Sequence, residues 1–431
     1  MINLLQGKRI LFANVPTDGH FNPLTALAKY LQAAGADVRW YTSAIYADKL
    51  AALQIPHYPF VHAREINGHN LLAAIPEMQT ASGPEKGRLY LQHLFIDRSV
   101  EYYEDIKNIY STFPFDVFVA DNMFSAMPFV KHKLLVPVVA IGVIPLIEDS
   151  VDVAPAGRAL PPAADAETRE AYAQMYAQKY AGIRPLISLY NAYLQQHNIS
   201  VAGSFIFDTL VKEADIFLQI GTPGFEYYRS DIGSNVKFIG ALLPQQAPAS
   251  STGWFDARLK KYSKVLLVTQ GTVEGDVSKI IAPTLKAFQN TDTLVIATTG
   301  GSGTQLLREK YQAENCIIED YIPFNEVMPY VSVYVTNGGY GGTILSIMNG
   351  VPIVAAGVYE LKNEICARID HFGIGIDLQT ETPSPEAIFT AAEKIMQDAA
   401  YKESITTLQH EMTRYDSFTL CTSYIAMQLN K

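Results

Sequence analysis

Short apolar runs rich in β-branched residues alternate with amphipathic, helix-like stretches over the first nine-tenths of the chain. This alternation is typical of parallel sheets built from βαβ units, in which a helix follows each strand and packs on the sheet. The predicted strands are residues 9–15, 38–41, 115–120, 136–143 and 236–239 in the first half, and residues 265–269, 293–298, 316–319, 333–336 and 352–355 in the second half. The sequence therefore predicts an α/β fold.

The first helix is predicted to begin at Asn22 and Pro23, after a loop over residues 16–20. Asn22 is a favourable N-cap, and Pro23 suits the first helical position, where no backbone N–H is needed. Gly35 favours the end of this helix. His20 is therefore expected in the loop that follows the first strand.

Two interruptions divide the alternation into halves. Residues 151–200 carry many Ala, Pro, Tyr and Gln with little strand pattern, and we interpret them as a helical excursion away from the sheet. Residues 244–253 (PQQAPASSTG) are the best candidate for a linker. The pattern therefore predicts two α/β domains, residues 1–240 and 241–416, that face each other across a ligand-binding cleft.

Composition and charge narrow the classes of function. The chain has 431 residues, of which 48% are hydrophobic and 18% charged, so it can bury two cores and is not expected to be disordered. Its formal net charge of −10 argues against a nucleic-acid partner. The longest apolar stretch, residues 134–147, is too short to span a bilayer, and no secretory signal is evident. With three cysteines, a cytoplasmic location without stable membrane insertion is expected.

Two polar residues follow strands in the first half. His20 lies just after the first predicted strand, and Asp121 follows the strand over residues 115–120. Functional groups collect at the carboxyl ends of parallel strands, and a His held by a carboxylate is a good general base near neutral pH. The alternative is that His20 is a turn residue and Asp121 a helix cap, and position alone favours that alternative.

The second half carries a glycine-rich motif, TNGGYGGT, directly after the strand over residues 333–336. Glycines let the backbone approach a ligand, and the free amides of a helix start bind phosphate. The context favours a phosphate site over a flexible packing loop. The motif residues assigned to it are Asn337, Gly338, Gly339, Gly341, Gly342 and Thr343.

Other familiar signals are absent from the sequence. No Gly-x-Gly-x-x-Gly follows the first strand, and there is no P-loop, so neither dinucleotide nor P-loop nucleotide binding is indicated. His57, His62 and His69 lack zinc-site spacing, so no metal is implied. The glycine-rich residues 299–303 are sufficiently explained as a turn.

Several motifs, in this order and spacing, resemble those of the inverting UDP-glycosyltransferases, closest to the bacterial enzymes that act on macrolides and flavonoids. The resemblance covers nearly the whole chain. The motifs are GHFNP at 19–23, VAD at 119–121, FIGALLP at 238–244, QGT at 270–272, YIP at 321–323, the glycine motif, GVP at 350–352 and GIG at 373–375.

This resemblance implies a GT-B architecture, in which two Rossmann-like domains face each other across a cleft. The first domain would bind the acceptor and the second the nucleotide-sugar donor, with a last helix from about residue 417 to 431 packing back on the first. His20 would be the general base, assisted by Asp121. No cofactor is implied beyond the UDP- or dTDP-sugar co-substrate. Besides the glycine motif, the implied donor-binding residues are Gly271, Thr272, Tyr321, Ile322, Glu360 and Lys362.

Departures from the family pattern bear on the donor. Asn337 stands where the family usually has His, and Leu345 stands where it usually has a ribose-binding acid. The pair that commonly holds the sugar hydroxyls corresponds to Leu361 and Lys362. A deoxysugar such as rhamnose is therefore a candidate alongside glucose.

The implied partners are a nucleotide sugar and a small apolar acceptor of flavonoid, phenolic or polyketide type. Two other readings remain open: a GT-B nucleotide-sugar epimerase and a non-catalytic nucleotide-sugar-binding protein. The presence of both His20 and Asp121 argues against them, and the oligomeric state is not predicted. The candidate acceptor-binding residues are Phe21, Phe60, Phe95, Met123, Phe124 and Ile144, for each of which core burial is an equal alternative.

Overall fold

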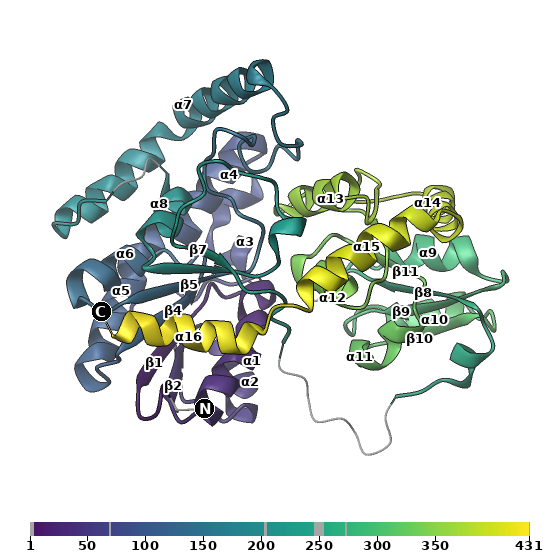
Figure 1. Ribbon diagram of the computed structural model, residues 1–431, viewed down its shortest axis with the longest axis horizontal. Coiled ribbons are helices and arrows are strands. Elements are labelled where there is room, and N and C mark those ends of the chain that lie inside the picture. Colours follow the sequence, from purple (N-terminus) through teal and green to yellow (C-terminus); the bar gives the residue numbers. More distant parts are fainter. Residues whose placement is uncertain (1–3, 69, 202–204, 245–253, 272–273, 431) are drawn as a thin grey trace.

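The chain forms two α/β lobes, each with a central parallel sheet covered by helices on both faces (Figure 1). The computed structural model describes residues 4–430 apart from 69, 202–204, 245–253 and 272–273. The predicted α/β fold is confirmed. Of the predicted linker at residues 244–253, all but Pro244 lies outside the described residues.

The first lobe contains a seven-stranded sheet with the order β3-β2-β1-β4-β5-β6-β7. Its strands are β1 (Arg9–Ala13), β2 (Asp37–Tyr41), β3 (His57–Tyr58), β4 (Val117–Asp121), β5 (Val138–Gly142), β6 (Ile216–Gln219) and β7 (Val236–Phe238). Its helices are α1 (Asp18–Ala33), α2 (Ala47–Ala52), α3 (Leu71–Ala74), α4 (Gly83–Leu91), α5 (Asp97–Thr112), α6 (Met127–Phe129), α7 (Ala166–Gln196) and α8 (Ile206–Glu213).

The second lobe contains a six-stranded sheet with the order β10-β9-β8-β11-β12-β13. Its strands are β8 (Lys264–Thr269), β9 (Thr293–Thr298), β10 (Cys316–Glu319), β11 (Val333–Thr336), β12 (Ile353–Ala355) and β13 (Gly375–Asp377). The remaining helices are α9 (Ile281–Phe288), α10 (Thr304–Lys310), α11 (Phe324–Val327), α12 (Tyr340–Met348), α13 (Lys362–His371), α14 (Pro385–Gln397), α15 (Ala399–Met412) and α16 (Ser417–Leu429).

Strict alternation along the strands explains why both faces of each sheet are covered. In β1, Ile10 and Phe12 belong to one hydrophobic cluster, while Leu11 and Ala13 belong to another on the opposite face. Successive strand residues point to opposite faces, so a strand that is apolar throughout needs helices on both sides. One of these clusters continues from the first lobe into the second and includes Leu267 of β8, so the two lobes share a core.

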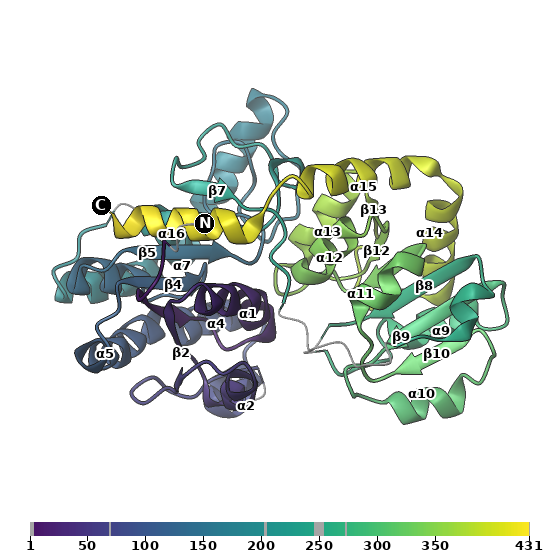
Figure 2. The same cartoon turned by 60° about the horizontal axis from the view of Figure 1, so that its bottom comes forward.

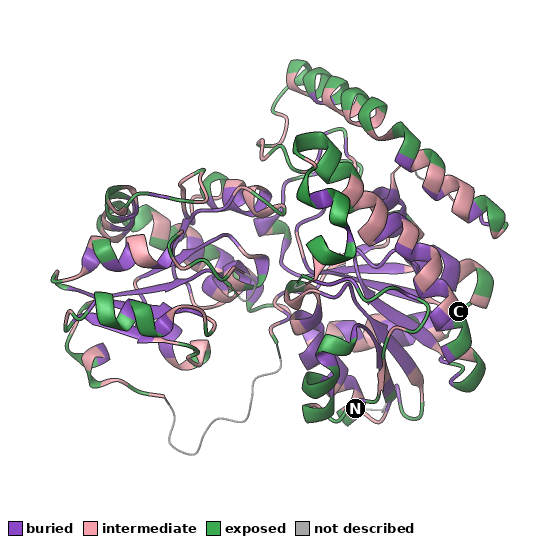
Figure 3. Cartoon of the chain, turned by 180° about the vertical axis from the view of Figure 1, so that it is seen from behind, coloured by how far each residue is buried: buried purple, intermediate pink, exposed green. Residues whose placement is uncertain are grey.

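Two long helices depart from the lobe-by-lobe order. The helix α7 runs over the outside of the first lobe with most of its surface exposed, as the helical excursion predicted for residues 151–200 (Figure 3). The final helix α16 crosses back from the second lobe and contacts α1, β4 and β6 of the first (Figure 2). There Phe418 stacks on Tyr30, with ring centroids 4.9 Å apart.

The first helix begins earlier than its sequence predicts. It starts at Asp18 with Thr17 as the N-cap, and the N–H groups of His20 and Phe21 both donate to the Thr17 carbonyl at 3.0 Å. Asn22 is therefore not the cap, and Pro23 lies inside the helix. The prediction placed His20 in a loop; it lies in the first turn of α1, because backbone hydrogen bonds to Thr17 outweigh the local preference of the Asn-Pro pair.

Candidate functional site

Both sheets reverse their strand order at one position, and the predicted site residues gather there. In the first sheet β1 has β2 on one side and β4 on the other, and in the second sheet β8 lies between β9 and β11. Ligands of open parallel sheets bind at such a switch point, outside the carboxyl ends of the strands. His20 follows β1 and Asp121 ends β4, while Gly271 follows β8 and Asn337 follows β11.

The structure brings His20 and Asp121 together across 101 residues of sequence. Their contact joins His20 Nδ1 and Asp121 Oδ1 at 2.7 Å. Asp121 is fully buried, and its carboxylate also accepts the N–H groups of Val15 at 2.6 Å and Met123 at 2.9 Å. Three donors thus hold the carboxylate in one orientation. With Nδ1 donating to Asp121, the tautomer leaves Nε2 as the nitrogen that can accept a proton.

The six predicted acceptor residues differ in how far they reach the cleft. Phe21 is 1% exposed and stacks on Tyr46, with ring centroids 4.1 Å apart, inside the core of the first lobe. Phe124 is fully buried and stacks on Tyr102 at 4.6 Å. Neither ring reaches the protein surface, because each packs inside one of the two hydrophobic clusters of the first lobe.

The other four candidates differ in their surroundings. Met123 joins the site through its backbone bond to Asp121, and Phe60 is half-buried against Tyr41. Phe95 is buried and forms an edge-to-face contact with Phe207 at 4.9 Å. Ile144 lines a pocket between the two lobes.

In the second lobe the glycine motif forms a turn and the start of α12. Gly339 is the N-cap of this helix. Its first three N–H groups, those of Tyr340, Gly341 and Gly342, precede the first intrahelical bond, which runs from the Thr343 N–H to the Gly339 carbonyl at 3.0 Å. The Thr343 hydroxyl also donates to Gly339. Thr343 therefore presents neither group to a ligand, unlike the glycines before it.

Two positions of the motif are held by close packing. The Asn337 Nδ2 donates to the backbone carbonyl of Gln270, which ties the loop after β11 to the loop after β8. Gly338 has φ +77°, and a Cβ there would lie 2.4 Å from Cys366 Sγ. Glycine is therefore required at 338 both by backbone conformation and by space.

The residues predicted around the nucleotide lie near one another. Gly271 has φ +77°, and a Cβ at Gly300 would lie 3.7 Å from its carbonyl oxygen. Tyr321 is 73% exposed and its hydroxyl donates to Gly300 at 2.8 Å, while Ile322 packs partly buried against the core. The neighbouring Thr272 lies outside the described residues. The loop over residues 299–303, read from sequence as a turn, thus borders the site between Gly271 and Tyr321.

Glu360 and Lys362 meet at the start of α13. Lys362 Nζ lies 3.0 Å from Glu360 Oε2. Glu360 and Leu361 both have positive φ, +56° and +63°. Consecutive non-glycine residues in this conformation are rare and concentrate at functional sites. Desolvation of its hydroxyl raises the pKa of Tyr90 to about 12 and the Glu360 carboxylate adds to the rise, so Tyr90 of α4 lies close to this turn.

A buried charge cluster joins the two lobes, and the sequence carried no local signal for it. Arg368 of α13 donates to Glu226 of the first lobe at 2.6 Å and to Glu364 at 3.1 Å. Glu364 in turn accepts the backbone N–H groups of Gly157 and Ala159, at 2.7 and 2.8 Å. Burial alone would raise the pKa of Glu226, but the Arg368 and Arg229 guanidinium groups outweigh it and hold the pKa below its usual value.

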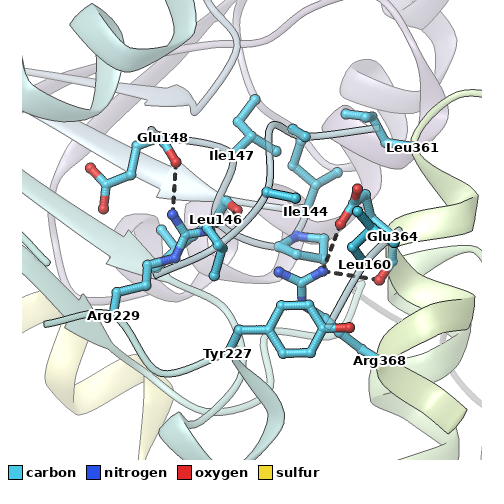
Figure 4. A pocket seen from close by; sticks show the side chains of 14 residues that line it. Ile144, Leu146, Ile147, Glu148, Leu160, Tyr227, Arg229, Leu361, Glu364 and Arg368 are labelled. Atoms are coloured by element: carbon cyan, nitrogen blue, oxygen red, sulfur yellow. Dashed lines mark hydrogen bonds and ion pairs between the residues drawn. The ribbon is translucent and has the colours of Figure 1, made fainter. Parts of the chain in front are cut away.

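This cluster borders a narrow pocket between the lobes (Figure 4). Apolar side chains from the loop after β5 and from the residue before α13 line this pocket, among them Ile144, Leu160 and Leu361. Glu148 lies at the far end, 6% exposed, and burial raises its pKa to about 7. Arg229 donates to the Glu148 backbone carbonyl at 2.7 Å. The same guanidinium also donates to the Leu146 carbonyl, so Arg229 holds the loop after β5 at two points.

The described part of the chain shows neither a metal-binding cluster nor a membrane-spanning helix. No three His, Cys, Asp or Glu side chains there are close enough together to hold a metal ion. Within the same residues, no helix combines the length and apolar character that crossing a membrane demands.

The chain is similar to known glycosyltransferases in sequence and in fold. Residues 200–412 match the family model described as UDP-glucoronosyl and UDP-glucosyl transferase. The chain is 30% identical to UDP-glucosyltransferase 1 of Beauveria bassiana (strain ARSEF 2860), over 92% of this chain and 90% of the relative. It is 28% identical to 4'-demethylrebeccamycin synthase of Lentzea aerocolonigenes, over 95% of this chain and 97% of that relative.

Among solved structures, the chain is similar to the glycotransferase of kitacinnamycin. The TM-score is 0.75 at 18% sequence identity, and the match covers 98% of this chain and 100% of the other. At this identity the likeness concerns the fold. It confirms the two-domain GT-B arrangement predicted from the sequence resemblance.

Proposed function

The chain belongs to the UDP-glycosyltransferase family, and from this premise we propose that it transfers a sugar, with inversion, from a UDP- or dTDP-sugar to a hydroxyl of a small apolar acceptor. The observation that carries the proposal is the hydrogen-bonded pair of His20 and Asp121 at the switch point of one sheet, in a fold whose other sheet carries a glycine-rich helix start at its own switch point.

In this mechanism His20 Nε2 takes the proton of the acceptor hydroxyl as its oxygen attacks the anomeric carbon. The bond from that carbon to the diphosphate oxygen breaks on the opposite face, which inverts the configuration. Asp121 stabilises the imidazolium that forms and keeps the ring oriented. General-base assistance of this kind contributes about 10² to 10⁴ in rate.

The second lobe would stabilise the departing nucleoside diphosphate. The first three amides of α12 and the positive end of its dipole suit the phosphate oxygens. Asn337 uses one Nδ2 hydrogen on Gln270, so its second N–H can donate to a phosphate oxygen. Such fixed donors would stabilise charge on the leaving group without a metal ion.

Our proposal for the donor sugar and nucleotide rests on positions where this chain differs from the usual residues of the family. Leu345 cannot hydrogen bond ribose hydroxyls, so we propose that deoxyribose and ribose donors both bind. Leu361 and the Glu360–Lys362 pair replace the usual sugar-binding pair, which favours a deoxysugar such as rhamnose alongside glucose. The relative from Beauveria bassiana is named a UDP-glucosyltransferase, which supports glucose.

The acceptor proposal rests on the apolar character of the first lobe. Ile144 lines the pocket between the lobes, Met123 contacts Asp121 through its backbone, and Phe60 packs against the apolar cluster of this lobe. A flavonoid, phenolic or polyketide-like acceptor suits such surroundings. The epimerase and binder readings are not favoured, because neither needs a His base held by a buried carboxylate. A cytoplasmic location fits the three free, buried cysteines.

A donor panel tests the proposal. Purified protein is given UDP-glucose, UDP-rhamnose, dTDP-rhamnose or UDP-N-acetylglucosamine with a mixture of phenolic acceptors, and products are followed by mass. We expect acceptor-plus-hexose or acceptor-plus-deoxyhexose masses, with anomeric inversion seen by NMR. The Asp121→Asn variant is the control for catalysis by this site. Nucleotide binding without any transfer product from the whole panel would contradict a transferase with these acceptors.

A further inference from the structure

Tyr340 crosses from the second lobe into the first. It is the first residue of α12, directly after the loop that carries Asn337 and Gly338. Its hydroxyl donates to the backbone carbonyl of Ile220 at 2.7 Å, beyond the end of β6. The side chain is 8% exposed, so this bond between lobes is shielded from water.

Gln219 meets Tyr340 from the other side. Its side chain is fully buried at the end of β6, and its Nε2 donates to the carbonyls of Ile220 at 2.8 Å and Ile144 at 2.9 Å. The same Nε2 lies 3.4 Å from the Tyr340 hydroxyl. The Ile220 carbonyl thus accepts from both lobes, and Ile144 belongs to the loop that lines the pocket between them.

Two glycines make room for this junction. A Cβ at Gly221, which has φ +109°, would lie 2.9 Å from the Tyr340 hydroxyl. A Cβ at Gly142 would lie 2.2 Å from Gln219 Oε1. The backbone on the first-lobe side is therefore shaped around the two polar side chains, and no larger residue fits at either position.

We propose that Tyr340 and Gln219 are positioning residues, which fix the acceptor-side loop at Ile144 relative to the free amides of α12 and so set the approach of acceptor to donor. This inference rests on the proposed transferase function. It follows because one end of the junction lies within the first turn of the donor-side helix and the other holds the wall of the acceptor pocket. In a transfer between two bound substrates, a displacement of about 1 Å costs about 10² in rate.

The test separates transfer from donor hydrolysis. In Tyr340→Phe the ring and the backbone N–H stay and the hydroxyl is lost, and we expect the ratio of transfer to acceptor-free hydrolysis of the donor to fall about tenfold. The matched control is Tyr172→Phe, which removes a buried hydroxyl that donates to the Pro161 carbonyl at 2.8 Å within one lobe. Equal losses of transfer and hydrolysis in Tyr340→Phe would overturn the proposal.

A double-variant cycle tests whether the two residues act through one junction. We expect Tyr340→Phe combined with Gln219→Met to lose no more transfer than the stronger single variant, since both changes release the same connection. A loss of transfer in the double variant equal to the product of the two single losses would show that the residues act independently, and would overturn the proposal.

Hydrogen exchange on the ligand-free protein gives a readout that does not need activity. Peptides over residues 143–150 and 340–345 should exchange faster in both single variants than in the wild type, and at the wild-type rate in Tyr172→Phe. Unchanged exchange would overturn the coupling even where transfer is lost. If the variants exchange faster but the wild type itself transfers no sugar, the coupling between the lobes is supported and the proposed function is contradicted.

Discussion

The two functional edges of this molecule are built from different parts of the polypeptide. On the first lobe the proposed chemistry lies in side chains: the His20 ring and the Asp121 carboxylate that holds it. On the second lobe it lies in the backbone, at Gly271, at Gly338 with its positive φ and at the free amides before Thr343. Both edges occupy the same place in their sheets, at the reversal of strand order.

This difference explains why one half of the site could be predicted from the sequence better than the other. A backbone site needs glycines at fixed positions, because any Cβ would collide or force strain, and such a requirement leaves a motif. A side-chain site can be lined by many alternative apolar residues that also serve as core. Phe21 and Phe124 illustrate this, since both are fully packed inside the lobe.

The largest effect is expected where the first lobe depends on one side chain. His20→Ala should lower transfer by about 10² to 10⁴, because it removes the proposed general base, while UDP affinity measured by calorimetry stays unchanged. Asp121→Asn should lower transfer as well, since the ring loses its anionic partner. If His20→Ala transferred sugar at a rate within threefold of the wild type, the His20 side chain would not be the general base.

A second prediction concerns the charge of Glu148, on the loop after β5. Burial raises the pKa of Glu148 from an ordinary 4.5 to about 7, so between these values the folded chain keeps a proton that the unfolded chain has lost. The free energy of unfolding should therefore fall as pH rises from 4.5 to 7, by about 3 kcal/mol from this group.

Urea unfolding at a series of pH values measures this slope. The matched variant Glu148→Gln carries no ionisable group and should be flatter than the wild type across the same window. Parallel curves for the two proteins would show that Glu148 titrates alike in the folded and unfolded chains.

The smallest effect is expected from a substitution that tests whether the backbone of the glycine motif binds the donor. Gly338→Ala adds a Cβ where φ is +77° and Cys366 Sγ is 2.4 Å away, so the loop must shift and the donor KM should rise about tenfold. Gly350→Ala is the control, because its φ of +60° imposes similar strain at the far end of α12, where the Cβ meets only the flexible Gln409 side chain.

Gly350→Ala should lower the melting temperature and leave the donor KM unchanged. Equal rises of KM in both variants would mean that strain in α12 as a whole, rather than the geometry of its first turn, governs donor binding.

Sequence alone determined the features that depend on near neighbours along the chain. Apolar runs with helical stretches between them predicted ten of the thirteen strands in the described part of the chain, since pattern and propensity act over a few residues, but they missed β3, β6 and β13. The glycine motif predicted the start of α12, and Asp121 was predicted at the end of a strand. The resemblance to a known family then indicated the two-lobe arrangement.

Only the tertiary structure decided what depends on distant residues. It brought the His20 ring to Asp121 across 101 positions and buried Phe21 in the core. It also joined Arg368 to Glu226 across 142 positions and Tyr340 to Ile220 across 120. Such contacts leave no periodic trace in the sequence, because they arise only when two completed sheets pack against each other.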